Sequence, residues 1–228
     1  MSIVKYNGMV VRSAGGKWIG SSAAPQPGAV IGGKTYPTVI MPDGNEWLAV
    51  NLDYAWNGLS VPTSPPTQAT SNDPQAMYYN YDEATYGWEG YKCGLLYNWR
   101  AVEYLEQNKS TLCPGWHVPS RNELADLATA LGGKSVAGTK LKALDHSVTS
   151  QWPSNFNGTD DYGFSALPAG QFLTNSFSDI GTKGGFWSSR RSDEYRATNY
   201  YVDAGSTWFQ SADSGIQFQK SVRLVKDS

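Results

Sequence analysis

The sequence contains few charged residues, and those it has do not cluster. Only 17% of its 228 residues are Asp, Glu, Lys or Arg, against roughly 25% in an average soluble domain. The formal net charge is −2, and the longest run of basic residues is the pair Arg190–Arg191. A nucleic-acid-binding surface needs many clustered cations to contact phosphates. The sequence therefore predicts that nucleic acid is not a partner.

Long apolar segments are also missing. No window approaches the roughly 18 consecutive apolar residues that a membrane-spanning helix requires, so we expect no insertion into a membrane. Residues 1–18 contain no apolar stretch like the core of a secretion signal, which is about 7–15 residues long. We expect no signal peptide in this chain.

Residues suited to covalent and metal chemistry are scarce. The two histidines, His117 and His146, cannot form a multi-histidine metal site within one chain. No Gly-x-Ser-x-Gly, Walker or His-Glu-x-x-His motif is present. Residues 157–161 gather oxygen ligands that suit Ca²⁺, but they fall short of an EF-hand loop, and we expect a solvated turn. The sequence predicts no metal, no cofactor and no enzymatic activity.

The few reactive side chains have ordinary structural interpretations. Cys93 and Cys113 either form a disulfide or remain a reduced, buried pair, and a core of this size favours the second because it does not need a covalent link. His117 lies between Pro114 and Pro119. We expect its imidazole to hydrogen-bond to the backbone rather than to act in catalysis.

Aromatic residues are abundant, with 9 Trp, 14 Tyr and 7 Phe, and they indicate a well-packed globular domain. Residues 1–30 differ, since Gly, Ser, Ala and Pro surround short apolar pairs. We expect this segment to be an anchor or oligomerisation segment followed by a linker. It either forms a homo-oligomer, for example a trimer, or packs on its own domain. Residues 31–228 are predicted to form one ligand-binding domain.

Local patterns predict few helices. Ser120 and Glu123 form a capping box that begins a helix, and Gly132-Gly133 ends it. A second helix is predicted over 98–106 and a weaker one over 137–144. The short apolar runs 38–40 and 46–50 flank a Pro-Asp-Gly-Asn turn and predict a hairpin.

The second half of the chain is predicted to be mainly β. Residues 55–92, by contrast, show neither a helical nor a strand period, and we expect an ordered surface loop there. The expected core residues of the late sheet are Phe186, Trp187, Val222 and Leu224. Strands are predicted within 163–170, 184–189, 197–202, 206–210 and 221–225.

The stretch before the last strand has the composition of a binding surface. Rigid aromatic rings give a large contact area at low entropic cost, and short polar side chains adapt to a ligand. An ordinary antiparallel sheet with aromatic core positions accounts for some of these rings. The predicted ligand-contact residues are Arg191, Glu194, Tyr195, Arg196, Asn199, Tyr201, Trp208, Gln210, Asp213 and Gln217.

Eight motifs in a fixed order resemble the major paralogous domain family of Fibrobacter succinogenes, over roughly residues 30–228. The motifs are Gly33-Lys-Thr-Tyr-Pro-Thr-Val39, Asn45-Glu-Trp-Leu-Ala-Val-Asn-Leu52, Gly94-Leu-Leu-Tyr-Asn-Trp99, Cys113-Pro-Gly-Trp-His-Val-Pro-Ser120, Leu131-Gly-Gly-Lys134 with Gly138-Thr-Lys-Leu-Lys142, Gly163-Phe-Ser-Ala-Leu-Pro-Ala-Gly170, Phe186-Trp-Ser-Ser189 and Ser221-Val-Arg-Leu-Val-Lys-Asp227.

The resemblance implies an α+β, C-type-lectin-like fold, with two main helices flanking a small antiparallel sheet, long loops and a display surface near the C-terminus. It also implies a non-enzymatic protein that binds a protein or glycan ligand on a cell surface. Similar proteins include phage tail-tip receptor-binding proteins, bacterial surface proteins and the variable proteins of diversity-generating retroelements. In the last group the diversified interval corresponds to Arg190–Lys220. The expected location is a virion tail or the cell surface.

Alternatives within the resemblance are a fixed-specificity carbohydrate-binding protein, a structural cell-surface protein and an enzyme of the formylglycine-generating type. Those enzymes use a cysteine pair, but Cys93 and Cys113 do not lie in a matching context. The Glu-Pro-Asn, Gln-Pro-Asp and Trp-Asn-Asp motifs of Ca²⁺-dependent lectins are absent. We therefore do not expect Ca²⁺-dependent sugar binding.

Overall fold

The structure is a computed structural model, and it describes residues 3–6, 9–14, 17–18, 28–65, 73–88, 92–144, 152–153 and 158–228. The first half contains β1 (Ile3–Tyr6), β2 (Met9–Ala14), β3 (Lys17–Trp18), β4 (Ala29–Ile31), β5 (Lys34–Tyr36), β6 (Thr38–Ile40), β7 (Glu46–Leu48), β8 (Ala76–Met77), the 3₁₀ helix η1 (Tyr79–Tyr81), α1 (Glu83–Tyr86), β9 (Leu96–Asn98), α2 (Trp99–Gln107) and α3 (Lys109–Leu112). The second half contains β10 (Trp116–His117), α4 (Arg121–Ala130), α5 (Lys134–Leu141), β11 (Ala169–Leu173), β12 (Ser176–Ile180), β13 (Lys183–Arg191), β14 (Arg196–Asp203), β15 (Gln210–Gly215), β16 (Gln219–Lys220) and β17 (Val225–Lys226).

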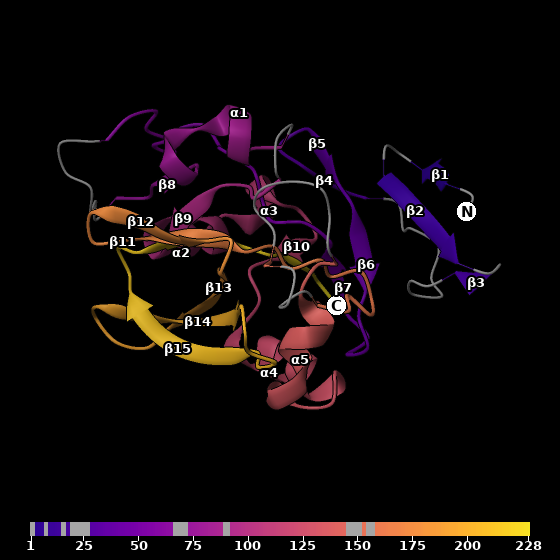
Figure 1. Ribbon diagram of the computed structural model, residues 1–228. Helices are drawn as coiled ribbons and strands as arrows, with labels where there is room; N and C mark the ends of the chain where they lie inside the picture. Colours follow the sequence, from indigo (N-terminus) through magenta and orange to yellow (C-terminus); the bar gives the residue numbers. More distant parts are fainter. Residues whose placement is uncertain are drawn as a thin grey trace.

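An eight-stranded sheet dominates the molecule (Figure 1). Its order is β15-β14-β13-β11-β16-β9-β8, with β12 paired to β11 off this path. The pairing of β11 with β13 is parallel, and the other ladders of this sheet are antiparallel. A second sheet has the order β10-β17-β7-β6, so the last strand inserts between strands from much earlier in the chain.

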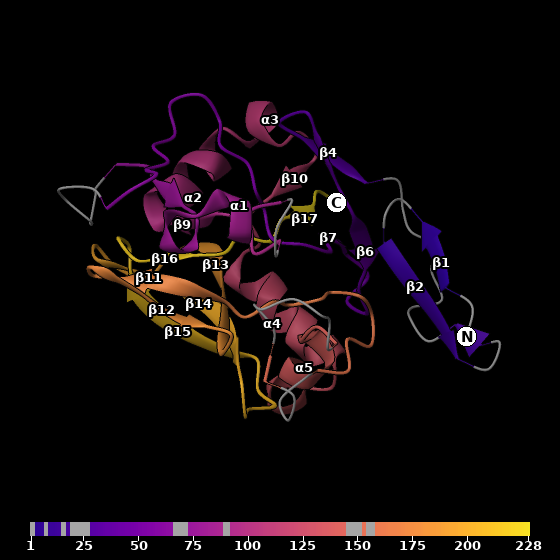
Figure 2. The same ribbon diagram turned by 45° about the horizontal axis from the view of Figure 1, so that its top comes forward.

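Helices cover the large sheet from two sides (Figures 1 and 2). Helices α4 and α5 pack beside β14, whereas α2 packs against β9 and β13. Neighbouring residues of β13 therefore face different cores. Phe186 packs in the core formed with α4 and α5, and Trp187 packs in the core formed with α2.

The expected core residues of the late sheet are confirmed. Phe186, Trp187, Val222 and Leu224 are all fully buried. Beside them lies a buried cation, Arg223, whose guanidinium donates to Asn51 Oδ1 at 2.9 Å and to the carbonyl oxygens of residues 48, 164 and 165. It thereby ties the C-terminal segment to two earlier segments of the chain.

Several local predictions are confirmed. The hairpin appears as β6 and β7, and the helix at 98–106 appears as α2. The capping box of α4 is complete, because Ser120 Oγ accepts from Glu123 N and a Glu123 carboxylate oxygen accepts from Ser120 N. Gly132 and Gly133 end α4 with φ angles of 98° and 101°, a conformation that glycine adopts without strain.

Other boundaries differ from the predictions. The weak third helix lies at 134–141 rather than 137–144, and the strand expected over 206–210 begins only at Gln210. The stretch expected to be an ordered loop, of which 66–72 and 89–91 lie outside the described residues, contains β8, η1 and α1. These elements are two to four residues long, too short to produce a visible period.

The expected architecture, a C-type-lectin-like α+β fold with two main helices flanking a small antiparallel sheet, is wrong. From β4 onward, 14 strands form three sheets, five α-helices are present in the described residues, and the molecule is mostly β. The error has a physical cause. Strands such as β8, β9 and β16 are stabilised by partners distant in the sequence, and nothing in their own two or three residues predicts that pairing.

The predicted N-terminal segment is described only in part. Its strands β1, β2 and β3 form an antiparallel three-stranded sheet. In the described part of the chain the longest helix, α4, has ten residues, well short of the roughly 20 that cross a bilayer. No helix described in the structure could therefore span a membrane.

Candidate functional site

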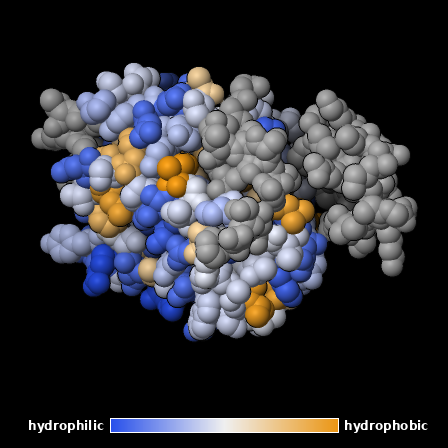
Figure 3. Space-filling model, in the orientation of Figure 1, coloured by the Kyte–Doolittle hydropathy of each residue, from blue (hydrophilic) through white to orange (hydrophobic). Residues whose placement is uncertain are grey.

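The candidate site lies where β13 and β15 end and β14 begins, around the turn between β13 and β14. Residues 192–195 form this turn, and the register pairs Arg196 with Gly215 and Thr198 with Asp213. Hydrophilic side chains gather at this edge of the molecule, at the lower left of Figure 3. We call residues 190–198 and 211–217 the hairpin-end surface.

Hydrogen bonds and ion pairs fix the turn. Asp193 accepts from the Tyr195 backbone amide at 2.9 Å and pairs with the Arg196 guanidinium at 2.8 Å. The bond from the Tyr195 amide and the nearby Arg196 cation hold the pKa of Asp193 below its ordinary value. Arg191 donates to the backbone oxygens of residues 193 and 194. The backbone of the turn is therefore pre-organised rather than loose.

The turn presents one large exposed ring. Tyr195 is 67% exposed, while its backbone carbonyl accepts from the Ile216 amide at 3.0 Å. The adjoining turn carries Gln217, whose side chain lies beside Gly215. A rigid backbone with an exposed ring is an arrangement typical of contact residues.

Strand geometry separates other predicted contact residues from this surface. Successive side chains of a strand point to opposite faces, so Asn199 and Tyr201 face away from Thr198. Asn199 is only 2% exposed, and its amide donates to Ala212 O and Ser214 Oγ. Tyr201 is half-buried beside the Lys183 ammonium, and its partner across the ladder is Gln210.

Trp208 lies at the opposite end of the hairpin. Eight residues of β14 separate it from the turn, about 26 Å at roughly 3.3 Å per residue. Its ring is 40% exposed and lies 5.7 Å from the Lys134 ammonium on α5. The structure therefore brings together Arg191, Glu194, Tyr195, Arg196, Asp213 and Gln217, and places Asn199, Tyr201, Gln210 and Trp208 elsewhere.

A polar hollow of about 240 Å³ opens on the hairpin-end surface. It lies between the first residue of α4, Arg121, and the Thr198 face of the hairpin, and Arg190 of β13 also lines it. The predicted ligand contacts include neither Arg121 nor Arg190, although Arg190 is the first residue of the interval that the resemblance implies is diversified. A signal for Arg121 was available, because a cation at the first position of a helix opposes the helix dipole.

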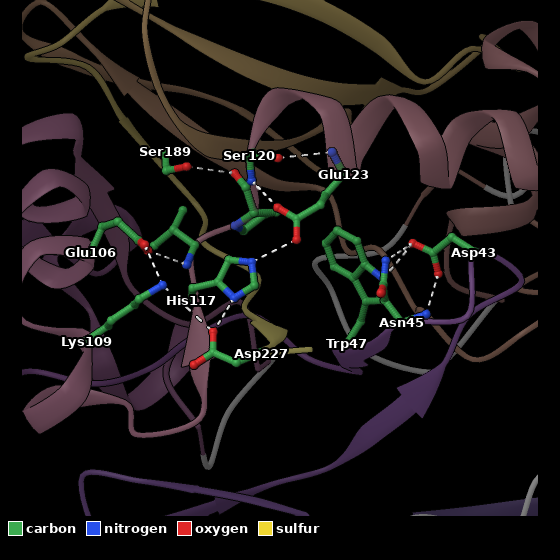
Figure 4. Close-up of polar contacts among 12 residues, drawn as sticks. Asp43, Asn45, Trp47, Glu106, Lys109, His117, Ser120, Glu123, Ser189 and Asp227 are labelled. Carbon is green, nitrogen blue, oxygen red and sulfur yellow. Dashed lines mark hydrogen bonds and ion pairs between the residues drawn. The ribbon is translucent and has the colours of Figure 1, made fainter.

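The sequence motif around His117 forms a charge network instead of the expected backbone contact (Figure 4). Its Nε2 lies 2.8 Å from Glu123 Oε1, and its Nδ1 lies 2.7 Å from Asp227 Oδ1. Only an imidazolium offers an N–H to both carboxylates, and the bond to Glu123 raises the pKa of His117. The expectation of a backbone partner is wrong, and the network links α4 to the chain's last residues.

Thiol and metal chemistry find little support in the described residues. Cys93 and Cys113 are both buried thiols, and burial raises the pKa of Cys113 to about 12. Such a thiol is protonated at neutral pH and a poor nucleophile. No group of three or more His, Cys, Asp and Glu side chains is placed to hold a metal in the part of the chain that the structure describes. His146 and Asn157 lie outside that part.

A comparison with family models identifies the chain. The model described as the Fibrobacter succinogenes major domain matches residues 43–226, which include the whole hairpin-end surface and both sides of the polar hollow. No curated protein and no solved structure shows significant similarity to the chain. Because the match covers most of its length, the chain belongs to the Fibrobacter succinogenes major domain family.

Proposed function

We propose that this protein is a non-enzymatic binding module that recognises a protein or glycan ligand on a cell surface through its hairpin-end surface. The observation that carries the proposal is the pairing of a fixed turn with exposed contact side chains. Asp193 holds the backbone in place, and the ring of Tyr195 projects into solvent.

This arrangement suits recognition for a physical reason. Ordering a flexible loop on binding reduces affinity, whereas a pre-organised loop avoids that loss. An exposed Tyr ring gives a large contact area with few rotatable bonds, and such residues often dominate binding energy. Glu194 and Arg196 add charges of both signs beside the ring, which favours a polar partner.

Alanine variants test the proposal. Labelled protein is first screened against a glycan array and intact bacterial cells, and the best-binding probe is then titrated. Tyr195→Ala should weaken binding at least tenfold, about 1.4 kcal/mol. Trp208→Ala is the matched control, because it removes an exposed aromatic ring of the same hairpin from the far end. Equal affinities of the wild type and Tyr195→Ala, or loss with Trp208→Ala alone, would contradict the assignment.

The proposal includes diversification of the interval Arg190–Lys220 by a retroelement. This interval also contains buried residues, among them Ala197, Val202 and Phe209. A functional diversified segment should vary at exposed positions and preserve these three. DNA sequencing of the gene's locus tests this. We expect a near-copy of the segment that encodes Arg190–Lys220, differing only where the copy has adenine and lying beside a reverse-transcriptase gene. If no such copy exists, the protein is a binder of fixed specificity.

We further propose that residues 1–30 attach the module to a phage tail tip or a bacterial surface, as a trimer. Light scattering with full-length protein and a variant that begins at residue 28 tests this, since the variant keeps β4 and its pairing with β5. Full-length protein should have three times the mass of one chain, and the shortened variant the mass of one. If both proteins have the mass of one chain, the role assigned to residues 1–30 is wrong.

A further inference from the structure

Two arginine side chains, Arg121 and Arg190, line the polar hollow. Arg100, Arg191, Arg196 and Arg223 each donate to a carboxylate, carbonyl or amide oxygen. In contrast, the guanidinium groups of Arg121 and Arg190 have neither an ion pair nor a hydrogen bond among the residues that the structure describes. Both are exposed, and both line the same hollow.

The one carboxylate in the hollow is already engaged. Asp213 Oδ1 accepts from Ser192 Oγ at 2.7 Å and from Thr198 Oγ1 at 2.9 Å. These hydroxyl bonds, together with the nearby charges of Arg196 and Arg190, hold the pKa of Asp213 below its ordinary value. Asp213 remains charged at neutral pH, so two cations and one anion leave the hollow with one excess positive charge.

The hollow also offers groups that bind hydroxyls. Ser211 lines it and forms no side-chain hydrogen bond among the described residues, and Asp213 Oδ2 keeps acceptor capacity beside it. A hollow of about 240 Å³ is smaller than the roughly 300–1,000 Å³ of sites that enclose a whole small molecule. It fits one ring of a larger ligand rather than a complete one.

From these observations we propose that the hollow binds an acidic sugar unit of the ligand. The guanidinium groups of Arg121 and Arg190 hold its oxyanion, either a carboxylate or a sulfate ester, through paired N–H donors. Ser211 and Asp213 contact the ring hydroxyls. The inference rests on the proposed function, and it names the chemical class of the glycan that the hairpin-end surface recognises.

Titrations of ¹⁵N-labelled full-length protein with glucuronate, glucose 6-sulfate and glucose test the site. The arginine Nε–Hε signals of residues 121 and 190 should shift with at least one of the two acidic sugars, and the acidic sugar that binds more tightly identifies the oxyanion. Glucose should bind at least tenfold more weakly than that sugar. Added salt should weaken the binding of the acidic sugar and leave the binding of glucose unchanged. Equal binding of all three probes, or no shift of either arginine, overturns the proposal.

Charge-removing variants complete the design. Arg121→Gln and Arg190→Gln should each reduce affinity for the acidic sugar at least tenfold. Arg100→Gln is the matched control, since it removes the same charge from α2, where Arg100 pairs with Glu103. If an array ligand binds in a Tyr195-dependent manner but is insensitive to both arginine variants, the sugar assignment fails and the binding function stands. If the protein binds no array glycan, no cells and none of the three sugars, both the sugar assignment and the binding function fail.

Discussion

Replacement of His117 by Gln should make the protein less stable at mildly acidic pH. The side chains of His117 and Glu123 are only 16% and 28% exposed, so solvent screens their contact incompletely. Burial alone would raise the pKa of Glu123, but its bonds to His117 and Ser120 outweigh burial and lower it from 4.5 to about 2. That fall corresponds to about 3 kcal/mol, shared among all partners of the carboxylate.

The share that belongs to His117 follows from the geometry. Two further bonds join Glu123 to Ser120, so we assign about half of the total to the imidazolium. The contact with Asp227, which is 43% exposed, adds little because solvent screens it. His117→Gln should therefore lower the free energy of unfolding by about 1.5–2 kcal/mol at pH 6, and lower Tm by about 3–8 °C for a chain of this length.

The pH dependence has a definite sign. The folded state raises the pKa of His117, so its contribution is fully present below the unfolded value of about 6.5 and is lost as pH rises through the folded pKa. Glu123 behaves oppositely, since its contribution is present above 4.5 and is lost as pH falls toward 2. The wild type should be most stable between about pH 4.5 and 6.5 as far as this pair is concerned.

Urea unfolding at pH 5.5, 7.0 and 8.5 measures the effect. Wild-type stability should fall from pH 5.5 to 8.5, and His117→Gln should remove most of that fall. Lys226→Gln is the control, because it also removes a cation from the same sheet, but from an ion pair whose lysine is 53% exposed. A wild type with no pH dependence in this range, or a Gln variant that keeps the full dependence, would refute the reasoning.

Three further predictions concern the core. Arg223→Met should lower the free energy of unfolding by about 3–5 kcal/mol, because Asn51, two buried carbonyl oxygens and one partly buried carbonyl oxygen lose their donor. A loss below 1 kcal/mol in urea unfolding would contradict this. Burial lowers the pKa of Lys220 from 10.5 to about 8, so Lys220→Met should stabilise the protein by about 1–2 kcal/mol at pH 7. The variant should also lose the rise in stability that the wild type shows between pH 8 and 10.5. A variant less stable than the wild type in urea unfolding at pH 7 would contradict this prediction. Gly138→Ala should lower Tm by several degrees, since its Cβ would lie 2.2 Å from Trp208 O; an unchanged Tm in a thermal scan would show that residues 206–209 shift freely.

The sequence alone determined the features that depend on neighbouring residues. The capping box of α4 joins two residues three positions apart, and the β6–β7 hairpin turns within residues 41–45. The apolar residues Phe186, Trp187, Val222 and Leu224 are buried wherever the chain can cover them, because their transfer from water is favourable in any fold. Such features are visible in a short window of sequence.

The tertiary structure decided the features that join distant residues. Arg121 and Arg190 belong to different elements and meet only because α4 packs beside the β14 face of the sheet. His117 meets Asp227 across 110 positions because β17 pairs with β10. Strands as short as β8 and β16 exist through their partners alone, which is why the predicted architecture failed. No local window encodes these contacts, since each depends on the cooperative pairing of segments whose own preferences are weak.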